Sequence, residues 1–199
     1  LAASVLTEER IVIHNCPRIT DVLNMAQILE ELGCRTSFTD GALTVDPSDA
    51  ANHEIPAALA KELRSSVFML GSVLSRFGRA RIAYPGGCDI GLRPIDLHLG
   101  GLRRLGVRIE EEGGYINCTC GKMRGADIVL GCPSVGATEN IMLAAVKAEG
   151  TTVIRNAAKE PEIADLQNFV NRMGGRISGG GSSTVVVEGV KSLHGAEYT

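Results

Sequence analysis

The chain repeats one pattern of apolar and glycine residues three times along its 199 residues. The pairs Leu32-Gly33, Leu105-Gly106 and Met173-Gly174 each close an apolar helical stretch, and they lie roughly 70 residues apart. Regular spacing of this size indicates internal repetition. One copy is too small to bury its own apolar face, so we expect three copies to close around a shared core.

Each copy is predicted to run helix, strand, helix, strand, strand within a single domain, and the copies cover about 1–55, 56–125 and 126–190. Predicted helices span residues 21–32, 57–76, 96–105, 135–149 and 161–173. Predicted strands span residues 10–14, 35–38, 42–45, 79–84, 107–111, 115–120, 151–155, 176–178 and 184–188.

The apolar pattern also predicts which layer is buried. The run from Ile141 to Val146 is apolar on every side of a helix, and such a helix requires burial all round. The strands at 115–119 and 184–188 mix apolar and polar positions, as half-exposed strands do. We therefore expect an α/β fold with helices at the centre and small sheets outside.

Composition excludes several classes of protein. A net charge of -3 provides no general attraction for nucleic acid, and no apolar run is long enough to span a membrane. Six cysteines without a secretory context favour reduced thiols in the cytoplasm. Cys118 and Cys120 share a strand face, but a structural zinc site needs four ligands, so we expect no metal and no cofactor. The chain lacks an initiator Met, which suggests a piece of a longer protein.

The stretch from Tyr84 to Asp96 joins a predicted strand to a predicted helix and contains three glycines and two prolines. It carries Cys88 at its centre, with Arg93 five residues later. A nearby guanidinium favours the reactive thiolate. These residues alone leave two readings open: a chemically active thiol or an incidental cysteine in a surface loop.

Three segments resemble the UDP-N-acetylglucosamine 1-carboxyvinyltransferase family of enolpyruvyl transferases: residues 85–98, residues 133–138 and residues 148–163. The resemblance covers essentially the whole chain. It implies a fold of two pseudo-symmetric domains, each an inside-out α/β barrel of three repeats. It also implies transfer of the enolpyruvyl group of phosphoenolpyruvate to the 3'-hydroxyl of UDP-N-acetylglucosamine, with release of phosphate, as the first committed step of peptidoglycan synthesis.

Two parts of the family pattern are missing here. The Lys-Asn pair that contacts phosphoenolpyruvate should precede Leu1, and the second domain carries the general-base aspartate and further arginines. The resemblance therefore implies one domain truncated from a two-domain enzyme and inactive alone. We expect the missing domain to be its partner, and we expect the exposed cleft face to allow pairing of chains.

The resemblance assigns the chemistry to Cys88, as the acid that protonates the methylene carbon and as the point of attack of fosfomycin. Arg93 would clamp an anionic group, unless it is an ordinary surface arginine. Arg64, predicted within a helix, would contact the UDP-sugar. Residues 94–97, Pro94, Ile95, Asp96 and Leu97, would bind the uridine portion mainly through the backbone, and Asp96 has the alternative role of helix N-cap.

Ser134, Val135 and Gly136 open an apolar helix, and by resemblance they bind the diphosphate through free N–H groups and the helix dipole. Without the family, these residues are simply a capped helix start. Cys132 stands where the family often has lysine, so only a backbone contact is expected from it.

Two alternatives remain beside the leading hypothesis. The shikimate-pathway enolpyruvyl transferase shares the fold but lacks the cysteine loop. A non-catalytic repeat domain that binds a nucleotide sugar or a protein would have the same architecture without turnover.

Overall fold

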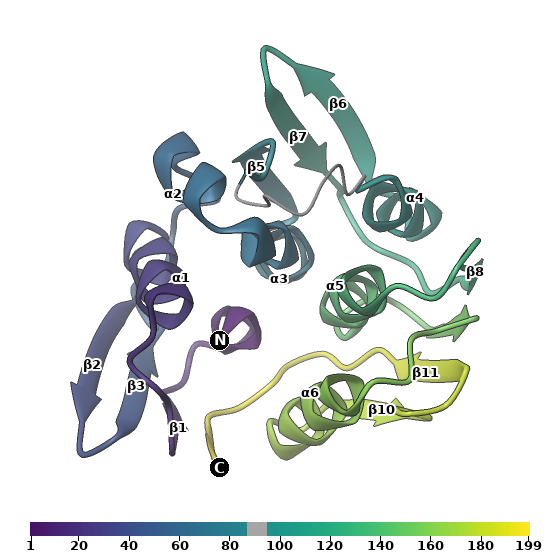
Figure 1. The fold of residues 1–199 in the computed structure, drawn as a ribbon. Helices are drawn as coiled ribbons and strands as arrows, with labels where there is room; N and C mark the ends of the chain where they lie inside the picture. Colours follow the sequence, from purple (N-terminus) through teal and green to yellow (C-terminus); the bar gives the residue numbers. More distant parts are fainter. Residues whose placement is uncertain (87–94) are drawn as a thin grey trace.

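A computed structural model of the chain describes residues 1–86 and 95–199, and in these residues the strands form three four-stranded sheets around central helices (Figure 1). Helices lie at the centre and the sheets lie at the periphery, as the apolar pattern predicts. The inside-out arrangement is therefore confirmed.

The first third of the chain supplies three strands of the first sheet, together with two helical segments. Its elements are η1 (Ala2–Leu6), β1 (Ile11–Ile13), α1 (Thr20–Glu31), β2 (Arg35–Thr39) and β3 (Ala42–Asp46). The second third contains β4 (Glu54–Ile55), α2 (Ala57–Glu62), η2 (Arg64–Phe68), α3 (Met69–Phe77), β5 (Arg79–Ala83), α4 (Asp96–Arg104), β6 (Arg108–Glu112) and β7 (Tyr115–Thr119). The last third contains β8 (Asp127–Val129), α5 (Val135–Ala145), β9 (Thr151–Arg155), α6 (Pro161–Arg172), β10 (Arg176–Ser178), β11 (Thr184–Glu188) and β12 (Ala196–Tyr198).

Each sheet contains one short strand that the sequence pattern does not predict. β4, β8 and β12 pair in parallel with β5, β9 and β1, whereas the other pairs in each sheet are antiparallel. These strands have two or three residues, too few for alternation to be visible. The pair β12–β1 joins the two ends of the chain and closes the ring of three sheets.

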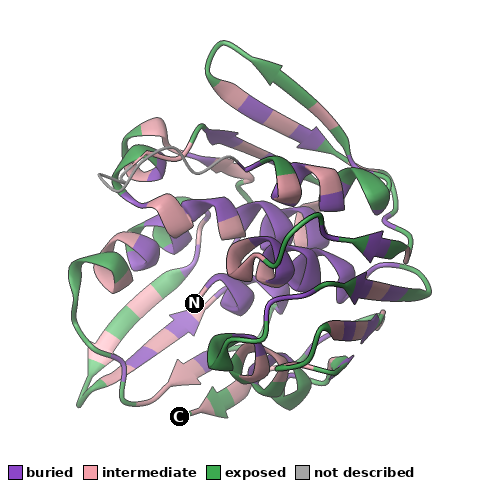
Figure 2. Cartoon of the chain, turned by 45° about the vertical axis from the view of Figure 1, so that its right-hand side comes forward, coloured by how far each residue is buried: buried purple, intermediate pink, exposed green. Residues whose placement is uncertain are grey.

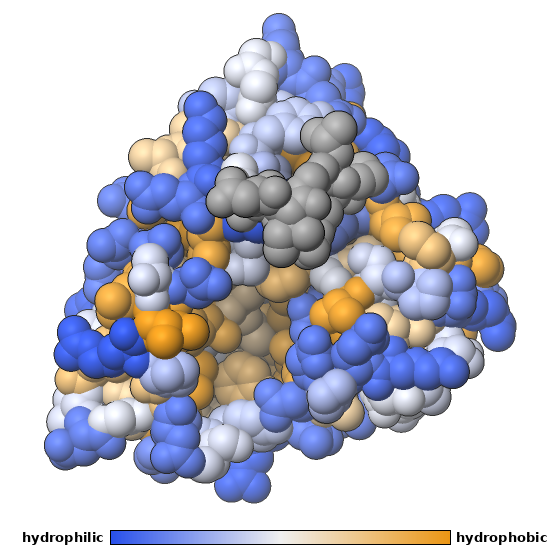
Figure 3. Space-filling model, in the orientation of Figure 1, coloured by the Kyte–Doolittle hydropathy of each residue, from blue (hydrophilic) through white to orange (hydrophobic). Residues whose placement is uncertain are grey.

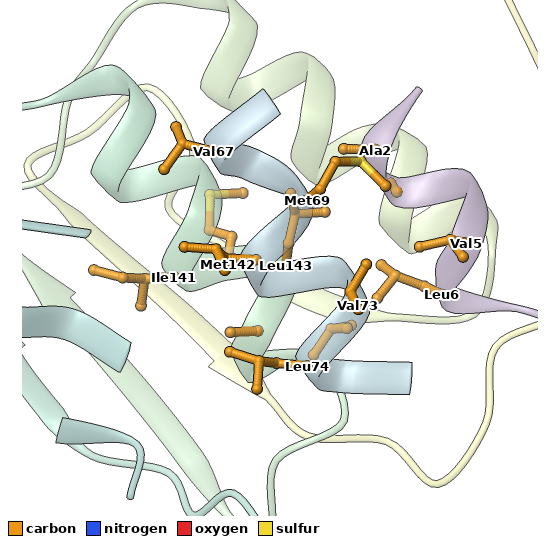
Figure 4. Close-up of a cluster of buried hydrophobic side chains, with 14 of the residues drawn as sticks. Ala2, Val5, Leu6, Val67, Met69, Val73, Leu74, Ile141, Met142 and Leu143 are labelled. Carbon is orange, nitrogen blue, oxygen red and sulfur yellow. The ribbon is translucent and has the colours of Figure 1, made fainter. Parts of the chain in front are cut away.

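The central helices are buried as a fully apolar helix requires. Seven consecutive residues of α3, Met69 to Ser75, are buried, as are Ala137 and most of the α5 residues that follow it (Figure 2). α3, α5 and η1 supply one core cluster, which includes Leu6, Val73 and Met142 (Figure 4). Burial of this kind stabilises a domain by about 25 cal/mol for each Å² of apolar surface.

Three of the predicted helix ends that precede a glycine are confirmed. Gly33, Gly106 and Gly174 have φ values of 99°, 92° and 93°, immediately after the C-caps of α1, α4 and α6. This left-handed conformation is easy for glycine and costly for other residues. The repeat detected in the sequence is thus a repeated helix stop.

Two predicted helices are wrong in their extent. The helix over 57–76 is broken at Leu63, which has extended backbone angles of φ -126° and ψ 111°, and it divides into α2, η2 and α3. The buried hydroxyl of Ser66 donates to the Ala60 carbonyl across the break, an alternative that serine offers to helical pairing. The helix over 135–149 ends at Ala145 instead.

Within residues 1–86 and 95–199, none of the helices is both long and apolar enough to cross a membrane.

Candidate functional site

A cavity of about 1020 Å³ opens where η2, the first turn of α4 and the loop before α5 meet. Its wall contains seven of the predicted site residues: Arg64, Asp96, Leu97, Cys132, Ser134, Val135 and Gly136. They come from two of the three repeats and are far apart in the sequence. The structure therefore brings together most of the predicted residues that it describes.

The remaining predicted residues fall into two groups. Cys88, Arg93 and Pro94 lie outside the described residues. Ile95 is described and buried, with 7% of its surface exposed, and it lies outside the set of cavity-lining residues. The described residues next to positions 87–94 are Gly86, whose N–H donates to the Ala60 carbonyl on α2, and Ile95, which precedes α4.

The helix break at Leu63 positions Arg64. Because the chain leaves α2 in an extended conformation, Arg64 becomes the first residue of η2 instead of a mid-helix residue. Its side chain lines the cavity beside Ser65 and Phe68. The predicted mid-helix position of Arg64 is therefore wrong, because the break at Leu63 makes it the first residue of a 3-10 helix.

Asp96 is not the N-cap of α4. That position belongs to Ile95, which makes no capping side-chain bond, and Asp96 is the first helical residue. An exposed carboxylate there interacts favourably with the helix dipole without accepting a capping bond. The N-cap alternative is therefore wrong, while Asp96 remains on the cavity wall.

The start of α5 is capped as the sequence indicates. The Ser134 hydroxyl accepts a bond of 3.3 Å from the Ala137 N–H, and the Ser134 carbonyl accepts from the Thr138 N–H and hydroxyl. A helix N-terminus concentrates N–H groups and partial positive charge, which favours anionic ligands.

Gly136 allows a close approach of side chains to this helix end. A Cβ at this position would lie 2.9 Å from Phe68 Cε1, 3.0 Å from His98 Cε1 and 3.2 Å from His98 Nε2. Real Cβ atoms essentially never approach another heavy atom more closely than about 3.0 Å, so the absent side chain creates the space that the two rings occupy.

His98 is a site residue that sequence reasoning misses, because the four histidines show no usable spacing. It lines the cavity, is 7% exposed, and stacks on Phe68 with a centroid separation of 6.3 Å. Burial, assisted by Arg64 and opposed by Asp96, lowers the pKa of His98 to about 4. The ring is therefore neutral at physiological pH.

Asn140 is the second missed residue. It is fully buried on α5, and its side chain contacts α3, η2 and α4. One sequence signal could have identified it: a lone amide directly before the apolar run 141–146 must find hydrogen-bond partners inside the core.

A smaller apolar hollow adjoins the cavity. Its volume is about 290 Å³, and it shares Asp21, Ser65 and Phe68 with the cavity wall. Figure 3 shows the apolar lining of the central hollow on this face of the molecule. Glu139 lies in the wall, where burial and the nearby Glu162, opposed by the terminal amine of Leu1, raise its pKa to about 7.

We expect His98 and Glu139 to change the free energy of unfolding in opposite directions as pH rises. The folded chain keeps His98 neutral down to about pH 4, whereas the unfolded chain protonates it near pH 6.5. The free energy of unfolding therefore decreases as pH falls from about 6.5 to about 4. The folded chain keeps Glu139 protonated up to about pH 7, whereas the unfolded chain releases the proton near 4.5. For Glu139, the free energy of unfolding therefore decreases as pH rises from about 4.5 to about 7.

Urea unfolding of the parent chain, His98→Gln and Glu139→Gln at several pH values measures both slopes. As pH rises from 4 to 6.5, the free energy of unfolding of the parent chain should increase by roughly 3 kcal/mol relative to that of His98→Gln. Relative to Glu139→Gln, the free energy of unfolding of the parent chain should instead decrease as pH rises. Each variant therefore serves as the control for the other. Parallel curves for all three proteins would contradict the assigned protonation states.

The chain is similar to known proteins over its full length. The profile of the family EPSP synthase (3-phosphoshikimate 1-carboxyvinyltransferase) matches residues 1–199. UDP-N-acetylglucosamine 1-carboxyvinyltransferase 2 of Caldanaerobacter subterraneus subsp. tengcongensis is 59% identical over 100% of this chain and 48% of its own length. UDP-N-acetylglucosamine 1-carboxyvinyltransferase 1 of Symbiobacterium thermophilum is 50% identical over 100% of this chain and 46% of its own. The chain thus spans about half the length of the curated relatives it matches.

Solved structures share the fold. The enolpyruvyl transferase NikO from Streptomyces tendae superposes with a TM-score of 0.85 at 23% identity, over 100% of this chain and 47% of its own. EPSP synthase from Acinetobacter baumannii gives a TM-score of 0.72 at 18% identity, over 98% and 46%.

Proposed function

The chain belongs to the EPSP synthase family, and from this premise we propose that it is one domain of a two-domain enolpyruvyl transferase. The whole enzyme would transfer the enolpyruvyl group from phosphoenolpyruvate to the 3'-hydroxyl of UDP-N-acetylglucosamine and release phosphate. This reaction would commit the sugar to cell-wall peptidoglycan. The observation that carries the proposal is the cavity that gathers Arg64, Asp96 and Leu97 with the Ser134–Gly136 helix end.

The cavity would hold the nucleotide sugar in three parts. Backbone groups of residues 94–97 would bind the uridine, and the N–H groups at Ser134, Val135 and Gly136 would receive the diphosphate. Arg64 would add a positive charge from η2, and Cys132 would contribute only its backbone. Arg93 would clamp an anionic group of phosphoenolpyruvate or of the sugar.

Cys88 would act as general acid. Its thiol proton would go to the methylene carbon of phosphoenolpyruvate while the sugar 3'-oxygen bonds to the neighbouring carbon. The hydroxyl proton would leave to the base in the second domain. The adduct would then lose phosphate, and a proton of the new methyl group would return to the Cys88 thiolate, which restores the double bond in the product and the thiol of the enzyme.

The second domain would cover the face that carries the cavity and the apolar hollow. Two observations support this: the chain spans about half of its relatives, and the hollow has an apolar lining. Without that domain, we expect two chains to pair through this face. We place the enzyme in the cytoplasm, where thiols such as the free Cys16, Cys34 and Cys118 stay reduced.

The experiment mixes this chain with the missing half of a relative and measures phosphate release. We expect release with phosphoenolpyruvate and UDP-N-acetylglucosamine together, and none from either half alone, because acid and base lie on different domains. Cys88→Ala in the mixture should lower the rate by at least about a hundredfold, a typical contribution of a general acid.

Two results would count against the proposal. Turnover by this chain alone would place the base within it. Phosphate release with 3-phosphoshikimate in place of the UDP-sugar would favour the shikimate-pathway reaction, which the family profile also describes. The curated relatives at 50–59% identity favour the UDP-sugar.

A further inference from the structure

The buried amide of Asn140 has one permitted orientation. Its Oδ1 accepts a bond of 2.7 Å from the Gly71 N–H, and its Nδ2 donates a bond of 3.1 Å to the Val67 carbonyl. Gly71 N–H can only donate and Val67 O can only accept. Rotating the amide by 180° would therefore place donor against donor and acceptor against acceptor.

This orientation determines the protonation of the neighbouring histidine ring. The second hydrogen of Asn140 Nδ2 points to His98 Nδ1, 3.1 Å away. A nitrogen that receives this bond must carry a lone pair, so Nδ1 is unprotonated and the ring proton lies on Nε2. Two backbone groups on α3 and η2 thus select the histidine tautomer through one side chain.

The protonated nitrogen lies at the start of α5. A Cβ on Gly136 would be 3.2 Å from His98 Nε2, and His98 itself lines the cavity. Among residues 1–86 and 95–199, Asn140 is the hydrogen-bonding partner of the ring, so within that part of the chain the Nε2–H has no acceptor. The helix end therefore has a buried side-chain donor beside its own N–H groups.

We infer that Asn140 is a positioning residue that holds His98 as the neutral Nε2–H tautomer, so that the ring donates a hydrogen bond to an anionic ligand oxygen at the start of α5. The ligand part of this inference rests on the proposed function, in which that oxygen belongs to the diphosphate of a nucleotide sugar. The tautomer itself does not depend on the ligand.

The surrounding charges agree with a neutral ring. Arg64 disfavours a second positive charge on His98, Asp96 favours it, and burial is the largest influence, which together lower the pKa of His98 to about 4. Protonation at Nδ1 would also set its N–H against the Asn140 N–H. A neutral donor offers an anion one directed bond, and among the described lining residues the positive charge comes from Arg64, beside the carboxylates of Asp21, Glu62 and Asp96.

Long-range nitrogen–proton NMR correlations of the histidine-labelled free chain test the tautomer directly. We expect one ring, identified because its signals vanish in His98→Gln, to carry its proton on Nε2 at neutral pH. A ring protonated on Nδ1, or exchanging between tautomers, would overturn the inference whatever the protein binds.

Asn140→Asp tests the cause. The carboxylate can still accept from Gly71, but it now presents an acceptor to His98 Nδ1, so the proton should move to Nδ1 or the ring should become charged. Asn171→Asp is the matched control, because Asn171 pairs with both backbone groups of Ile177. His98 signals should be unchanged in that control. An unchanged tautomer in folded Asn140→Asp would overturn the role of Asn140.

Titration with UDP-N-acetylglucosamine separates this inference from the proposed function. We expect the His98 Nε2 signal to shift, and we expect affinity to fall at least tenfold in Asn140→Asp but not in Asn171→Asp. Binding that shifts the amides of residues 134–136, with no change at His98 and full affinity in Asn140→Asp, would overturn the inference alone. No binding by the parent chain, either alone or mixed with the missing half of a relative, would overturn the proposed function and the ligand role of the ring, while the free-chain spectrum still decides the tautomer.

Discussion

Gly71→Ala should destabilise the chain by roughly 3–5 kcal/mol, from overpacking and a disturbed buried hydrogen bond. Gly71 lies where α3 crosses α5. A Cβ there would collide with the backbone carbonyl and the Oδ1 of Asn140 and would lie 3.2 Å from Ala144 N. Because two of these atoms belong to the backbone of a buried helix, the clash cannot be relieved by a side-chain rotation. Urea unfolding followed by circular dichroism measures the change.

Gly100→Ala is the matched control for this substitution. Gly100 is also helical, on α4, but a Cβ there would meet no atom within 4 Å. Replacing an interior helical glycine with alanine normally stabilises by about 0.5–1 kcal/mol, so the two variants should change stability in opposite directions. A loss below about 1 kcal/mol for Gly71→Ala would show that the α3–α5 crossing is less tightly packed than described.

Gly136→Ala should lower the affinity for the proposed ligand, UDP-N-acetylglucosamine, by at least tenfold while the chain stays folded. The new methyl group would press on Phe68 and His98 and would displace the ring that faces the start of α5. Reshaping a packed wall costs about 1–3 kcal/mol, and a tenfold loss corresponds to about 1.4 kcal/mol. Isothermal titration calorimetry measures the affinity.

Gly131→Ala distinguishes a local effect from a general one. Gly131 lines the same cavity, but a Cβ there would meet no atom within 4 Å. Affinity should therefore remain within about twofold of the parent value, a difference of roughly 0.4 kcal/mol. Equal losses in both variants, or undiminished binding by Gly136→Ala, would contradict the assignment of the helix start as the binding end of the cavity.

Local sequence patterns predict most of the architecture. The glycines after Leu32, Leu105 and Met173 stop three helices because a left-handed residue is needed there, and neighbouring residues suffice to show it. The apolar run from Ile141 to Val146 predicts a buried helix because no face of it can meet water. The N-cap at Ser134 can likewise be predicted from adjacent residues, because its hydrogen bond joins residues three apart.

Contacts between distant residues account for what the sequence pattern misses. The strands β4, β8 and β12 exist only through partners elsewhere in the chain, so two or three residues carry no visible signal. The break at Leu63 places Arg64 on the cavity wall, whereas local helix propensity favours a continuous helix.

Periodicity, helix ends and short motifs are enough to predict the threefold repeat, the buried helical layer, the family and seven of the residues that line the cavity. The packing of the folded chain is what brings His98 to the cavity wall and Asn140 into contact with it. Their 42-residue separation carries no pattern, and the hydrogen bond between them exists because α4 and α5 pack side by side. The direction of that bond depends on backbone groups of two further elements, α3 and η2, which no local reading of either residue can supply.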